Sequence, residues 1–117
     1  MRATTHRPAA ATKATATKGA GAAGVRHVCT GFSFSLATVG TAQAAALNCD
    51  IIDGASGGAT RLASLIIGGI PINSQVNIIV TGCMLIGTGA TAMTIEFDAA
   101  GAAASFERVN LQGFDVS

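Results

Sequence analysis

Residues 92–116 read AMTIEFDAAGAAASFERVNLQGFDV, and this stretch decides the class of fold. Met93, Ile95 and Phe97 alternate with polar residues, which is the period of a strand with one buried and one solvated face. A loop of small residues, 99–104, follows, and Val109 and Leu111 then alternate with polar residues again. The pattern predicts two antiparallel strands joined as a β-hairpin.

Further short strands are predicted upstream of this hairpin. Their apolar and polar residues alternate, or form short apolar runs, over residues 25–36, 45–51, 60–67 and 75–80. Residues 60–67 could also form a short helix, but their length and the flanking glycines favour a strand. Residues 82–86 form either a separate short strand or a continuation past a glycine bulge at Gly82. Glycine-rich turns separate them. One turn, DGASGG at 53–58, lacks the lysine and the helix of a phosphate-binding loop and is expected to be a hairpin loop. About seven strands and no reliable helix predict an all-β fold, an antiparallel β-sandwich of the jelly-roll or immunoglobulin-like type.

The N-terminal segment, residues 1–24, differs from the rest in composition. It is rich in Ala, Thr, Gly and Lys and shows no repeating apolar face. Such a segment cannot by itself offset the entropy lost on ordering. We therefore expect a basic arm over 1–24, which becomes ordered only on another subunit, and a β-sandwich domain over 25–117. Deleting the arm should leave the domain folded.

The overall composition suggests a subunit of an assembly. Charged residues make up 11 % of the chain and the mean hydropathy is +0.53, whereas typical soluble domains have roughly 25 % charged residues. Three cysteines lie far apart and without zinc-ligand spacing, so we expect small buried thiols in a reducing compartment. The sequence predicts no metal site and no cofactor.

Few residues suggest catalysis. Glu96 and Asp98 lie about 7 Å apart on one strand face, a spacing that could serve a glycosidase or a calcium site, but no aromatic residue accompanies them to stack a sugar. We interpret them as a solvated face. His27 is expected at a surface or an interface, and no serine lies in a GxSxG motif. The sequence thus predicts that the protein is not an enzyme.

Three runs of sequence resemble a group of small virion proteins of tailed bacteriophages. They are VRHVCTGFSFSLA at 25–37, DIIDGASGGAT at 50–60 and TAMTIEFDAAGAAASFERVNLQGFDV at 91–116. The last run closes on Gly113-Phe114-Asp115-Val116 where that group has GYDV, so Phe114 lacks the usual tyrosine hydroxyl. The resemblance implies a β-sandwich component of the virion, of the head decoration (cement) type or, less often, a head-fibre or tail-associated protein.

These observations give two hypotheses of different class. The first is a protein that decorates the outside of a phage capsid, assembled in the host bacterial cytoplasm, and bridges major capsid protein subunits as a homo-dimer or homo-trimer. Its capsid contacts would be the basic residues of the arm: Arg2, Arg7, Lys13 and Lys18. Phe114 and Val116, which change phase after Gly113, would form the oligomer interface. The alternative is a tail- or fibre-associated module that binds a host glycan through loops 53–60 and 88–91. Nucleic-acid binding by the arm is a weaker third reading, because no aromatic residues are interleaved with its charges.

Overall fold

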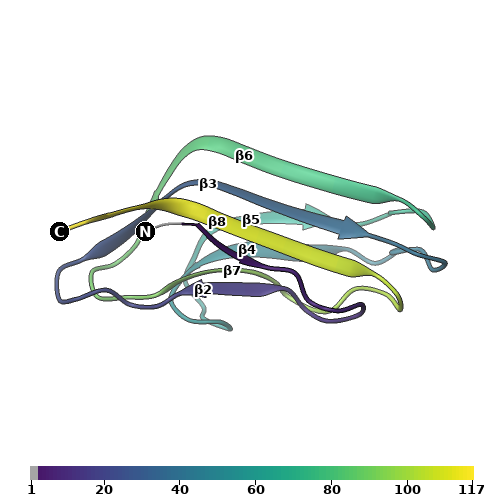
Figure 1. Cartoon of the computed structure of the whole chain (residues 1–117), viewed down its shortest axis with the longest axis horizontal. Helices are drawn as coiled ribbons and strands as arrows, with labels where there is room; N and C mark the ends of the chain where they lie inside the picture. The colour runs from purple at the N-terminus through teal and green to yellow at the C-terminus, as the bar shows by residue number, and fades with distance from the viewer. Residues whose placement is uncertain (1–2) are drawn as a thin grey trace.

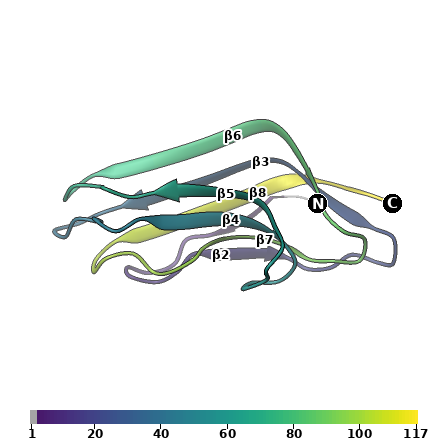
Figure 2. The ribbon, with the colours of Figure 1, turned by 180° about the vertical axis from the view of Figure 1, so that it is seen from behind.

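A computed structural model describes residues 3–117 and contains eight strands in two sheets (Figures 1 and 2). The strands are β1 (Thr4–His6), β2 (Thr15–Lys18), β3 (Arg26–Ala37), β4 (Leu47–Asp53), β5 (Arg61–Ile67), β6 (Gln75–Ile86), β7 (Met93–Phe97) and β8 (Phe106–Val116). One sheet has the order β1-β8-β3-β6 and the other β2-β7-β4-β5, and all pairs are antiparallel. The predicted β-sandwich is confirmed. No helix in the described part of the chain could cross a membrane.

Four of the six strand pairs are nested about a single turn. β1 pairs with β8, β2 with β7, β3 with β6 and β4 with β5. In each pair the two residues lie at nearly equal distances along the chain from the turn at Ser56-Gly57. The chain is therefore one nested antiparallel ribbon that is folded over on itself, which is the arrangement of an eight-stranded jelly roll.

This nesting overturns the prediction of a C-terminal hairpin. Both predicted strands exist, as β7 and β8, but they lie in different sheets, and residues 98–105 cross between them. The predicted solvated face of β7 is also wrong, because all five of its residues are buried. The alternation was read correctly as a strand, but the polar side chains Thr94 and Glu96 are covered by the loop between β4 and β5.

The N-terminal segment is part of the sandwich, which differs from the expectation of an arm. β1 pairs with β8 and β2 with β7. Ala14 and Ala16 are buried in the core. These two small side chains give the segment an inward face that belongs to the core.

The core lies between the two sheets. Phe34 and Phe97 meet edge to face near its centre, with ring centroids 5.7 Å apart. Leu36, Ile95 and Leu111 are fully buried around them. Cys29 and Cys49 are buried, as predicted, while Cys83 is half-buried, and all three are free thiols. Burial raises the pKa of Cys29 to about 12, so this thiol is protonated and unreactive near neutral pH.

The alternation changes phase twice in residues 106–116, between Phe106 and Val109 and again after Gly113, which predicts two bulges or twists. The first is absent: β8 runs in unbroken register from Phe106 to Gln112, with Phe106 on the outer face and Glu107 turned inward. The irregularity at Gly113 is present, but its extra residue is Thr30 on the neighbouring strand β3. Of the two alternatives at Gly82, the structure has the continuation: β6 runs through this residue, whose φ of 71° suits glycine.

Candidate interaction surface

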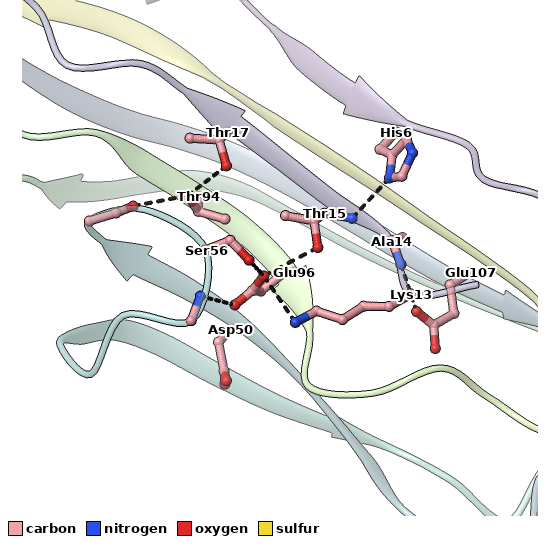
Figure 3. A network of polar contacts seen from close by, with 12 residues as sticks. His6, Lys13, Ala14, Thr15, Thr17, Asp50, Ser56, Thr94, Glu96 and Glu107 are labelled. Carbon is pink, nitrogen blue, oxygen red and sulfur yellow. Dashed lines mark hydrogen bonds and ion pairs between the residues drawn. The ribbon is translucent and has the colours of Figure 1, made fainter. Parts of the chain in front are cut away.

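Glu96 forms the densest polar cluster, on the outer side of the β2–β7 pair (Figure 3). Its carboxylate accepts hydrogen bonds from Ser56 Oγ at 2.6 Å, from Gly57 N at 2.8 Å and from Thr15 Oγ1 at 3.2 Å. Lys13 Nζ lies 3.3 Å away. Burial raises the pKa of Glu96, but the hydrogen bonds from Ser56 and Gly57 and the Lys13 ammonium outweigh it, so its pKa lies below the usual range.

Asp50 stands directly opposite Glu96 on β4. Two neighbouring carboxylates would suit acid–base chemistry if either faced a cleft. Asp50, however, accepts hydrogen bonds from Ser64 Oγ at 2.5 Å and Arg61 Nε at 3.0 Å. Both carboxylates are buried and occupied by donors of the protein, so the pair joins β2, the β4–β5 hairpin and β7 together. Asp98, expected on the same face as Glu96, is exposed. Its carboxylate accepts hydrogen bonds from the backbone N and the side-chain Nδ2 of Asn48.

A third buried carboxylate, Glu107, lies on the inner face of β8. Ala14 N donates to its Oε1 at 2.9 Å (Figure 3), and its Oε2 has no hydrogen-bond partner among residues 3–117. Burial raises the pKa of Glu107 to about 7, although the hydrogen bond from Ala14 opposes the rise. Glu107 is in phase with Val109 and Leu111, which places it on the inner face, but a charged residue is ordinarily assigned to the solvated face, so its burial was not expected.

His27 is buried within the chain, whereas a position at a surface or an interface was expected. Its Nε2 lies 2.7 Å from the Gly19 carbonyl oxygen, which can only accept, so Nε2 carries a proton. Its Nδ1 lies 2.6 Å from Asp115 Oδ1. These contacts link the segment after β2 to the ends of β3 and β8. Within the described residues no three His, Cys, Asp or Glu side chains gather as a metal site would require.

The predicted basic contacts are dispersed. Lys13 is engaged by Glu96, and Lys18 lies half-buried at the end of β2. Arg2 is outside the described residues. Arg7 is exposed just after β1. Since His6 pairs with Val109, Arg7 comes beside Arg108 on the next strand.

Arg7 and Arg108 border a groove of about 410 Å³ in the outer face of the β1-β8-β3-β6 sheet. Its floor is low because Ser33 and Ser35 are small, and Ile79 forms part of one wall. Neither arginine makes an ion pair with any of residues 3–117. Two like charges on neighbouring strands are unfavourable unless an anion lies between them. The groove therefore suits an acidic group of a partner.

The two loops that the glycan hypothesis names as its binding site lie together in the fold. Asp53 accepts hydrogen bonds from Thr88 N at 3.0 Å and Thr88 Oγ1 at 2.6 Å, which brings the loops at 53–60 and 88–91 side by side. At the far end of β8, Phe114 and Val116 are exposed. Their role in an oligomer stays a prediction.

Neither a scan against protein-family models nor a search of the curated proteins finds a match for this chain.

Proposed function

We propose that this protein is a structural component of a tailed-phage virion that decorates the outside of the capsid and stabilises it by bridging major capsid protein subunits. The observation that carries the proposal is the groove beside Arg7 and Arg108, a hollowed basic face with no reactive group in it. The sequence resemblance to small virion proteins supports it further. Jelly rolls occur in viral capsid and lectin domains, so the fold is compatible with the proposal without deciding it.

The proposed mechanism is mechanical. The outer face of the β1-β8-β3-β6 sheet lies on an acidic surface of the shell, with an acidic side chain between Arg7 and Arg108. Each copy contributes a modest contact, and many copies on a lattice act together as a multivalent clamp. No chemical step is involved, and the protein is proposed to be neither an enzyme nor a carrier of a cofactor.

Labelling of virions with an antibody to this chain tests the location. The proposal predicts label spread over the head, and label confined to the tail would contradict it. The double variant Arg7→Glu/Arg108→Glu should lower occupancy on capsids at least about tenfold, since it turns two attractive contacts into repulsive ones. Lys18→Glu separates this face from the basic segment as a whole, because Lys18 was also expected to contact the capsid but lies on the other sheet. Contact through the β1-β8-β3-β6 face predicts occupancy near that of the wild type, and a comparable loss would contradict it.

The alternative function is recognition of a host glycan. The observation in its favour is that Asp53 and Thr88 bring the loops 53–60 and 88–91 together, at one site on a fold that lectins also use. A glycan array probed with the full chain tests it. Binding that Thr88→Ala abolishes would support a glycan site, and an array without signal would eliminate it.

A further inference from the structure

The core is fully covered on the side of the sandwich formed by β1 and β2, which we call the closed side. It is only partly covered on the side formed by β5 and β6, which we call the open side. Seven half-buried apolar residues pack against the core, and all of them lie on β5 and β6: Leu62, Ala63, Leu65, Ile78, Val80, Cys83 and Leu85. On the opposite side, beside β1 and β2, Ala14 and Ala16 are buried. The inward-facing side chains of β6 therefore remain partly in contact with solvent.

β6 is also an unusual edge strand. It is twelve residues long and contains neither a charged residue nor a proline. The other three edge strands are short or carry a charge: β1 has three residues, β2 has four and ends in Lys18, and β5 begins with Arg61. Large apolar side chains stand exposed along β6, with Ile79 72 % and Met84 65 % accessible. Soluble proteins normally protect a long edge with charge, proline or a covering segment.

We propose that β6 pairs antiparallel with β6 of a second copy of this chain, which joins two four-stranded sheets into one of eight strands (Figure 2 shows β6 at the free edge of its sheet). A two-fold axis perpendicular to the sheet keeps the inner faces of both copies on the same side. Ile78 and Val80 of one copy then meet their counterparts, which covers the open side of both cores. The test of this interface does not involve the capsid, although Ile79 lies both on β6 and in the wall of the proposed capsid groove.

The chemistry of the edge favours a second copy over another partner. A strand without charge selects no charged segment, but it can face itself without repulsion. An isologous contact also requires only one self-complementary patch. We place the axis within Gln75–Thr81, where the pairing of β6 with β3 is unbroken, because the register shifts beyond Thr81. Seven paired residues bury less than a standard interface, so the dimer dissociates on dilution.

Sedimentation equilibrium of the full chain, with the variants Ile79→Lys and Met84→Lys, tests this. The wild type should show a monomer–dimer equilibrium. Ile79→Lys brings two ammonium groups near the axis and should raise the dissociation constant at least about tenfold. Met84→Lys is the matched control: it adds the same charge to the same strand at similar exposure, beyond Gly82, and should dimerise like the wild type.

Hydrogen exchange supplies the readout specific to strand pairing. Alternate amides of residues 75–81 should exchange slowly in the dimer and quickly in Ile79→Lys, since every second N–H of an edge strand points outward. Thermal unfolding of dilute Ile79→Lys should match the wild type, which excludes misfolding. A wild type that stays monomeric, a trimer, an equal loss with Met84→Lys, or a dimer that survives Ile79→Lys but is lost in Phe114→Ala would overturn the proposal.

Discussion

The two sides of the sandwich reverse what their compositions suggest. The side built from β1 and β2 comes from a polar, basic, low-complexity segment, yet it closes the core with Ala14 and Ala16. The side built from β5 and β6 comes from the most apolar part of the chain, yet it leaves that core partly open. How completely one side of the sandwich covers the core therefore depends on the space to be filled and on the partner strand available. Hydropathy alone does not determine it.

The largest expected effect comes from removing the closed side. Deletion of residues 1–18 takes away β1 and β2, the edge partners of β8 and β7, and uncovers Ile95 and Leu111. We expect loss of the cooperative thermal transition, measured by circular dichroism. A synthetic peptide of residues 1–18 added in trans should restore part of it. A truncated chain that melts cooperatively within a few degrees of the full chain would show that the segment is a dispensable arm.

Glu96→Ala tests what fastens this side to the rest. It leaves Lys13, Ser56 and Gly57 without their acceptor and should cost about 2–4 kcal/mol in the free energy of unfolding at pH 7. Because the folded pKa of Glu96 is lowered, its contribution is present above the unfolded pKa and is lost as the pH falls through the folded value. The variant should therefore lose less stability than the wild type on acidification in urea titrations. Asp98→Ala, at an exposed carboxylate on the same strand end, is the control and should cost less than half as much.

Glu107→Gln should act in the opposite direction. The folded pKa of about 7 exceeds the 4.5 that is ordinary for a glutamate, so the folded state binds more protons between these values and the wild type loses stability as the pH rises through them. Glutamine removes that loss and can still accept from Ala14 N. Relative to the wild type, the variant should gain about 1–3 kcal/mol between pH 5 and pH 8. Parallel stability–pH curves for the two proteins would refute the assignment.

The smallest effect is expected on the open side. Ile79→Lys should change the free energy of unfolding of the monomer by no more than about 0.5 kcal/mol, since its side chain is already exposed. The measurement is chemical denaturation at protein concentrations below dimerisation. A cost of several kcal/mol would mean that β6 is core in the monomer, and the contrast between the two sides would fail.

Much of the fold could be predicted from local pattern. The positions of β3 to β8 and the β4–β5 hairpin at 53–58 follow from alternation and glycine chemistry, which act over a few residues. The short strands β1 and β2 lie in the segment that was expected to be an arm. Partner choice could not be predicted in this way. Whether Met93–Phe97 pairs with the next strand or with residues 15–18 depends on long-range nesting, and both pairings satisfy the same alternation.

The candidate site was predictable only in part. Arg7 was singled out by its charge, but Arg108, its neighbour in the groove, lies far away in sequence and joins it only through the pairing of β1 with β8. The inward orientation of the Glu107 side chain was also not predicted. A charged residue is normally assigned to the wet face, and only the presence of Ala14 N opposite it explains its burial.

Hydrogen exchange at two protein concentrations tests the contrast between the sides most directly. We predict that the amides of Thr15–Lys18 that are bonded to β7 are as protected as those of Met93–Phe97 and that this protection does not depend on concentration, because both strands belong to one chain. Protection of alternate amides in Gln75–Thr81 should instead rise with concentration, as a second copy covers β6. Concentration-dependent protection of Thr15–Lys18 with constant exchange in β6 would contradict the account, since it would mean that a neighbouring subunit orders the N-terminal segment.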